Sequence, residues 1–78
     1  MKVGVYSVKD TKVSFSTPFY SHSDETAIRS FAEAVNSETP NAVKQYVEDK
    51  QLYRLGSFDD DTGVITSDIA FLVYGLDV

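Results

Sequence analysis

Apolar and polar residues alternate through the start of the chain, as they do in paired β-strands. Residues 2–8 are predicted to form a strand, with Val3 and Val5 on one side and Gly4, Tyr6 and Val8 on the other. Turn-forming residues follow at 9–12, and residues 13–17 alternate again as a second strand. Pro18 has no N–H to give to a strand ladder and should end that strand. The pattern predicts an N-terminal β-hairpin.

After residue 22 the apolar spacing changes to that of an amphipathic helix. Ser23 is the expected N-cap, and Asp24 and Glu25 fall in the first turn, where the helix dipole favours anions. The helix should end near Asn36, ahead of Pro40. The positions expected on its apolar face are Ile28, Phe31, Ala32 and Val35.

The second half of the chain predicts more strands. Residues 41–49 have the spacing of a short helical turn or an ordered loop. Residues 51–58 alternate as a strand, and the acidic run 59–63, which ends in glycine, is typical of a hairpin turn. Residues 64–66 and 69–74 are predicted as two further strands.

The resulting order is β-β-α-β-β-β in a single domain of residues 1–78. We therefore expect an α+β fold, in which a small antiparallel sheet carries one amphipathic helix on one face. One helix can cover only one face of such a sheet. The other face, to which some of the tyrosines must point, needs solvent, a partner chain or a ligand.

Composition limits the functions that this fold could serve. Twelve acidic and seven basic residues give a net charge of −5. Phosphate neutralisation supplies most nucleic-acid affinity, so this charge argues against a strong, sequence-independent DNA-coating protein. The chain has no cysteine and its only histidine is His22, so we expect no disulfide, metal or cofactor. A core this small favours self-association, and we expect a homodimer or a higher oligomer.

No segment suggests a membrane or a catalytic site. The longest apolar run, residues 69–74, is far shorter than the ~20 residues that cross a bilayer, so we expect a cytoplasmic protein without a membrane partner. No nucleophile elbow, P-loop or dinucleotide motif is present, and we expect no enzyme activity. The acidic run 59–63 lacks the glycine and glutamate positions of a calcium loop.

Aromatic residues next to basic ones form the most suggestive constellation. Tyr6 lies near Lys2, and Tyr53 lies between Lys50 and Arg54. Aromatic side chains on a sheet can stack on bases while basic neighbours follow the phosphates. These five residues are the predicted nucleic-acid contacts, although for each ring taken alone the sequence favours a place in the core. Strand alternation places Lys50 and Arg54 on one face and Tyr53 on the other, unless a bulge redirects one of them.

Three stretches in series resemble the small non-structural protein of gokushoviruses, which are single-stranded DNA phages of the Microviridae. The first is Ser-Thr-Pro-Phe-Tyr at residues 16–20, and the second, at 27–36, contains Ala-x-Arg-x-Phe followed by Val-Asn. The third, at 48–59, contains Glu-Asp, Leu-Tyr-x-Leu-Gly and Phe-Asp. Their order and spacing cover roughly residues 1–66. The chain departs from the pattern at Val47, where the family usually has proline, and in its apolar tail.

The resemblance implies a non-catalytic DNA-binding protein of phage genome replication in the host cytoplasm. Single-stranded DNA is then the implied partner, in the switch to single-strand synthesis and packaging. The acidic charge leaves a second possibility, a protein–protein adaptor that acts on the replication initiator or capsid precursor without touching DNA. The resemblance brings no catalytic residue and no established contact residue.

Overall fold

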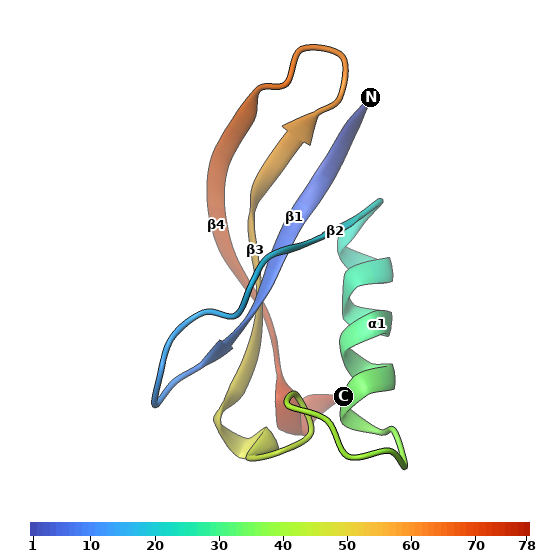
Figure 1. The fold of residues 1–78 in the computed structure, drawn as a ribbon, viewed down its shortest axis with the longest axis vertical. Coiled ribbons are helices and arrows are strands. Elements are labelled where there is room, and N and C mark those ends of the chain that lie inside the picture. Colours follow the sequence, from blue (N-terminus) through green and yellow to red (C-terminus); the bar gives the residue numbers. More distant parts are fainter.

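Four strands form one antiparallel sheet with a single helix beside it (Figure 1). The computed structural model describes all residues, 1–78. The elements are β1 (Lys2–Asp10), β2 (Phe19–Ser21), α1 (Asp24–Val35), the 3₁₀ turn η1 (Val47–Asp49), β3 (Lys50–Asp59), β4 (Ile65–Tyr74) and the 3₁₀ turn η2 (Gly75–Asp77). The strand order across the sheet is β2-β1-β3-β4. The predicted α+β class, with an antiparallel sheet and one helix, is confirmed.

The second strand lies later in the chain than predicted. Residues 13–17 do not form a strand, and β2 instead begins directly after the proline. One bridge of the predicted hairpin does form, between Lys9 and Phe15, with backbone hydrogen bonds from the Asp10 N–H to the Ser14 carbonyl at 2.9 Å and from the Ser16 N–H to the Val8 carbonyl at 2.8 Å. Serine side chains add to this short contact, and the ladder is not continued. The Ser7 hydroxyl donates to the Ser16 carbonyl at 2.7 Å, and the Val8 N–H donates to the Ser16 Oγ at 3.2 Å. Residues 13–17 are thereby held against β1 as a loop.

The two strands predicted at the C-terminal end are one continuous strand, β4. The prediction ended one strand at residue 66 and began the next at residue 69, and the serine and aspartate between them are residue types common in turns. In the structure Asp68 stays in the strand, and its carboxylate accepts a hydrogen bond from Arg54 Nη2 of β3 at 3.2 Å. An ion pair to the neighbouring strand thus keeps a turn-forming residue in extended conformation.

Gly56 allows β3 and β4 to approach closely at a sheet irregularity. The register of β3 shifts against both neighbouring strands between Arg54 and Gly56. A Cβ atom at Gly56 would lie 1.9 Å from the Thr66 carbonyl oxygen, which no side chain could tolerate. Glycine is therefore required where the bulge brings the two backbones together.

Helix α1 begins and ends as predicted. Ser23 is its N-cap and forms a capping box with Thr26, while Asn36 is the C-cap. The helix packs against the middle of the sheet through its apolar face. The fully buried core consists of Tyr6, Val8, Ala27, Phe31 and Leu52. Ile28 and Val35 are only half-buried at its margin.

The chain between α1 and β3 runs through turns into η1, in line with the expected short helical turn or loop over residues 41–49. Turn η1 lies against η2 at the end of the sheet where α1 finishes (Figure 1). At the opposite end, the β3–β4 hairpin and the N-terminus extend beyond the start of α1 (Figure 1). The helix therefore covers only part of one sheet face, and it leaves the other face open.

Replacing Phe31 with alanine should destabilise the protein by about 3–5 kcal/mol, because it removes the largest helix side chain from the core. That is a large fraction of the ~5–15 kcal/mol typical of domains. Urea unfolding followed by circular dichroism measures the loss. Ser30→Ala, an exposed neighbour on α1, is the matched control. Equal unfolding midpoints for Phe31→Ala and the parent would contradict the assigned core.

Candidate functional site

Four aromatic rings form a continuous row on the open face, the sheet face opposite α1. Phe15 comes from the loop after β1, Tyr53 from β3, and Phe71 and Tyr74 from β4. Successive ring centroids are 5.4, 5.7 and 4.7 Å apart. Phe15, Phe71 and Tyr74 are 41%, 43% and 52% exposed, although large apolar rings are usually buried. We call these four residues the aromatic row.

A lysine lies at the β1 end of the aromatic row. The Lys9 Nζ is 5.4 Å from the ring centre of Phe15 and 5.6 Å from that of Tyr53. Both distances are within cation–π range. The lysine forms no ion pair with a carboxylate. The open face thus combines accessible rings with a positive charge that is free to meet an anion.

Negative charge is absent from the open face of the three long strands. Alternation and the observed register place the following residues on this face: Val3, Val5, Ser7, Lys9, Gln51, Tyr53, Leu55, Gly56, Phe58, Ile65, Ser67, Ile69, Phe71 and Tyr74. None of them is acidic. The strand residues Asp10 and Asp68 belong to the helix side, and the other acidic residues lie at strand ends and outside the sheet. The net charge of −5 is therefore not a property of this face.

The other half of the open face is an apolar groove of about 370 Å³. Its apolar lining consists of Val5, Pro18, Tyr20, Leu55, Ile65 and Ile69. The Tyr20 ring contacts Phe58 with a centroid separation of 6.0 Å. Tyr20, Ile65 and Ile69 are each more than 60% exposed, so this half of the face has no covering layer.

Two of the predicted contact residues are part of an ion-pair network under the helix. Tyr6 is 1% exposed, and its hydroxyl donates to Asp24 Oδ1 at 2.8 Å. Arg54 Nη1 donates to the other Asp24 oxygen at 2.8 Å, and Nη2 reaches Asp68. These bonds tie the first turn of α1 to β1 and β3. Burial and the bond to Asp24 raise the pKa of Tyr6 to about 12.

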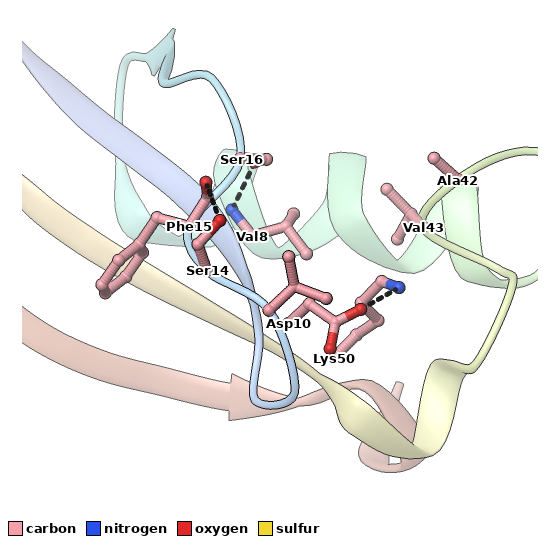
Figure 2. A pocket seen from close by; sticks show the side chains of 9 residues that line it. Val8, Asp10, Ser14, Phe15, Ser16, Ala42, Val43 and Lys50 are labelled. Carbon is pink, nitrogen blue, oxygen red and sulfur yellow. Dashed lines mark hydrogen bonds and ion pairs between the residues drawn. The ribbon is translucent and has the colours of Figure 1, made fainter.

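Lys50 is also engaged on the helix side. Its Nζ lies 3.1 Å from Asp10 Oδ2 and 2.9 Å from the Gln45 carbonyl, and its side chain is 10% exposed. Figure 2 shows this pair in a small pocket of about 240 Å³ between the β1 loop and Val43. A buried lysine with two partners has little to gain from exchanging them for a phosphate, because it would leave Asp10 unpaired.

The five predicted contacts therefore do not form one surface. Lys50, Arg54 and Tyr6 lie on the helix side, Tyr53 lies on the open face, and Lys2 lies at the far end of β1 opposite Asp59. The predicted separation of Tyr53 from Lys50 and Arg54 agrees with the structure. The bulge near Gly56 redirects neither base, because it begins after Arg54.

Sequence reasoning missed Lys9, Phe15, Phe71 and Tyr74 as members of a site. Phe15 was assigned to a strand that does not form, and Lys9 to a turn. The detectable signal was the high aromatic content of a chain with only one helix to bury it. Which rings would share the exposed face could be known only from the strand register.

The acidic segment after β3 forms a turn, as predicted, and Gly63 supplies the positive φ of 77°. The Met1 ammonium donates to Asp60 and Asp61 at 2.7 and 2.8 Å. These two bonds raise the pKa of the amine. The N-terminal ammonium is thus the cation that pairs with the carboxylates of Asp60 and Asp61.

The fold defines a small α+β protein, and the open face of its antiparallel sheet carries exposed rings and no carboxylate. The chain belongs to a phage family: the model of the Phage ORF5 protein family matches residues 3–78. Neither the curated proteins nor the solved structures contain a match. The single α-helix, with twelve residues and several charges, does not reach the length and apolarity needed to cross a membrane.

The raised pKa of Tyr6 predicts a specific loss of stability at high pH. The folded-state pKa of Tyr6 is about 12, above the ordinary 10.0. The stabilisation that the protonated hydroxyl gives to the folded state is therefore complete below pH ~10 and disappears as pH rises through 12. The free-energy difference between the parent and Tyr6→Phe should therefore shrink above pH ~10. Urea unfolding over a pH series measures it. Tyr46→Phe, which removes an exposed hydroxyl, is the control, and the same narrowing there would refute the assignment.

Proposed function

We propose that the protein binds single-stranded DNA on its open face as a non-catalytic accessory of phage genome replication. The observation that carries this proposal is the aromatic row on a sheet face without a single carboxylate. Exposed rings on a sheet are the usual platform for unpaired bases, and each stacked base contributes ~1–3 kcal/mol. The acidic charge of the chain does not oppose this mode, since it lies elsewhere on the molecule.

The geometry favours stacking over electrostatics as the source of affinity. Lys9 is the one cation beside the aromatic row, so only one phosphate or so would be neutralised there. Salt dependence should accordingly be shallow, with a slope of about −0.7 for each phosphate on a single strand. Duplex DNA keeps its bases paired and stacked inside, so its bases cannot use the rings.

Membership in a phage family supports a role in the phage cycle. The finer assignment, to gokushoviruses of the Microviridae, rests on the three sequence stretches that resemble their small non-structural protein. In such a phage the genome itself is the single strand that the protein would meet. We place its action in the host cytoplasm, at the switch from duplex replication to single-strand synthesis and packaging.

The second candidate function is a protein–protein adaptor that acts on the replication initiator or capsid precursor. The apolar groove lined by Tyr20, Ile65 and Ile69 favours it, because this half of the open face has rather more aliphatic than aromatic surface. An adaptor would bind its protein partner in the groove and would have no affinity for DNA.

Fluorescence anisotropy with a labelled oligo-dT strand tests the DNA proposal. Tyr53→Leu and Phe71→Leu should each weaken binding by ~1–3 kcal/mol, about 5- to 150-fold, because leucine keeps apolar bulk but cannot stack. The parent should bind a duplex of the same length more weakly than the single strand, and the two substitutions should change duplex binding little.

Two matched controls sharpen the measurement. Tyr46→Leu removes a 63% exposed ring outside the aromatic row and should leave affinity unchanged. Lys9→Gln should flatten the salt slope by about 0.7, whereas Lys44→Gln, on a distant loop, should not. If the parent shows no affinity for single strands even at low salt, DNA binding is wrong and the adaptor function takes its place.

A further inference from the structure

Strand β4 has a free outer edge along its whole length. It pairs with β3 on one side and with no strand on the other, and it lies at the margin of the sheet in Figure 1. About half of the backbone N–H and C=O groups of an edge strand point outward without a partner. In a strand of ten residues this leaves a long row of unpaired donors and acceptors.

This edge has the length for pairing and lacks the proline and lysine residues that often prevent it, although its register with β3 is irregular in two places. Edge strands are commonly short, interrupted by proline, or marked by lysine. Strand β2, at the other margin, fits that description, since it has three residues and follows Pro18. Strand β4 contains no proline and no basic residue, and its one charged residue, Asp68, forms an ion pair with Arg54 at 3.2 Å.

We propose that two copies of the chain pair through their β4 strands, antiparallel and around a two-fold axis, to form one continuous eight-stranded sheet. A second copy suits this edge because antiparallel pairing is self-complementary: the same strand supplies both sides of an isologous contact. The expected homodimer would then form through an edge, and the open face would stay accessible.

The side chains select the register. Pairing centred on Ala70 sets Ile69 opposite the partner's Phe71 on the open face, so that apolar side chains meet. It also sets Asp68 opposite the partner's Leu72. A register centred on Asp68 would instead bring two carboxylates together, which is unfavourable.

The dimer would enlarge the proposed DNA site. A two-fold axis perpendicular to the sheet keeps both helices on one side and both open faces on the other. The two aromatic rows then approach each other at the centre through Phe71, which lies next to the axis, with one Lys9 at each outer end. Each copy thus completes the surface of the other. This consequence rests on the proposed function, whereas the pairing itself does not.

Cysteine cross-linking tests the interface directly, because the chain contains no cysteine. Ala70→Cys should give a covalent dimer under mild oxidation on a non-reducing gel, since the two thiols would lie next to the axis. Ser30→Cys on the outer side of α1 should stay monomeric. Ser67→Cys points to the open face, and its thiols would be about 20 Å apart in this register. Cross-linking at Ser67 but not at Ala70 would overturn the edge pairing in favour of face-to-face contact.

Sedimentation velocity tests the non-covalent dimer. The parent should sediment as a dimer at concentrations on the order of 100 μM, and Ile69→Lys should raise the dissociation constant at least tenfold by placing a charge opposite the partner's Phe71. Val13→Lys adds the same charge at a 79% exposed apolar position away from β4 and should leave the dimer intact. A monomeric parent, or a dimer insensitive to Ile69→Lys, overturns the proposal. A monomer that still binds oligo-dT overturns the dimer alone and leaves the proposed function standing.

Discussion

A single three-turn helix is the only layer that covers a sheet whose strands run to ten residues. The helix is too small to cover both sheet faces, and the rest of the structure depends on this limit. The helix takes one sheet face, and its docking is fixed by Asp24, which accepts bonds from Tyr6 of β1 and Arg54 of β3. A charged group this close to the core stabilises only when its partners are in place. Arg54 of β3 therefore holds the helix, while Lys50 bonds to Asp10 and the Gln45 carbonyl on the same side of the sheet. The opposite face carries the aromatic row.

The acidic residues and the open face therefore lie on different parts of the molecule. A net charge of −5 on a compact domain usually argues against nucleic-acid binding. That argument assumes that the charge is spread evenly over the surface. Here the acidic groups gather around α1, the hairpin turn and the strand ends, whereas the long strands present only neutral and basic side chains on the open face. An anionic ligand approaching the molecule would be turned away from the helix side and admitted on the other.

Helix α1 could be predicted almost to the residue because its signals are local. The Ser23 cap, the acidic first turn and the apolar stripe all lie within thirteen residues. Strands depend on distant partners, so the alternation in β3 showed that Lys50 and Arg54 share a face but could not show which face the helix would cover. Both faces of β3 offer apolar candidates, Leu52 on one side and Tyr53 on the other. The aromatic row required the cross-strand register. The predicted second strand is reduced to one bridge between Lys9 and Phe15, and the paired strand β2 starts only after Pro18.

The register shifts between β3 and β4 have a mechanical consequence for any polymer on the open face. Strand β4 runs out of step with β3 twice, once near Gly56 and once near Leu52, and such bulges increase the local twist of a sheet. The rings of the aromatic row are also not parallel, since the plane of Tyr53 stands at 80° to that of Phe15 and at 75° to that of Phe71. A polymer that stacks on every ring of the aromatic row must change direction within a few ångströms. Duplex DNA is stiff over about 50 nm and cannot follow such a path. A single strand rotates freely about its backbone bonds, so the curvature of the sheet would itself discriminate between the two forms.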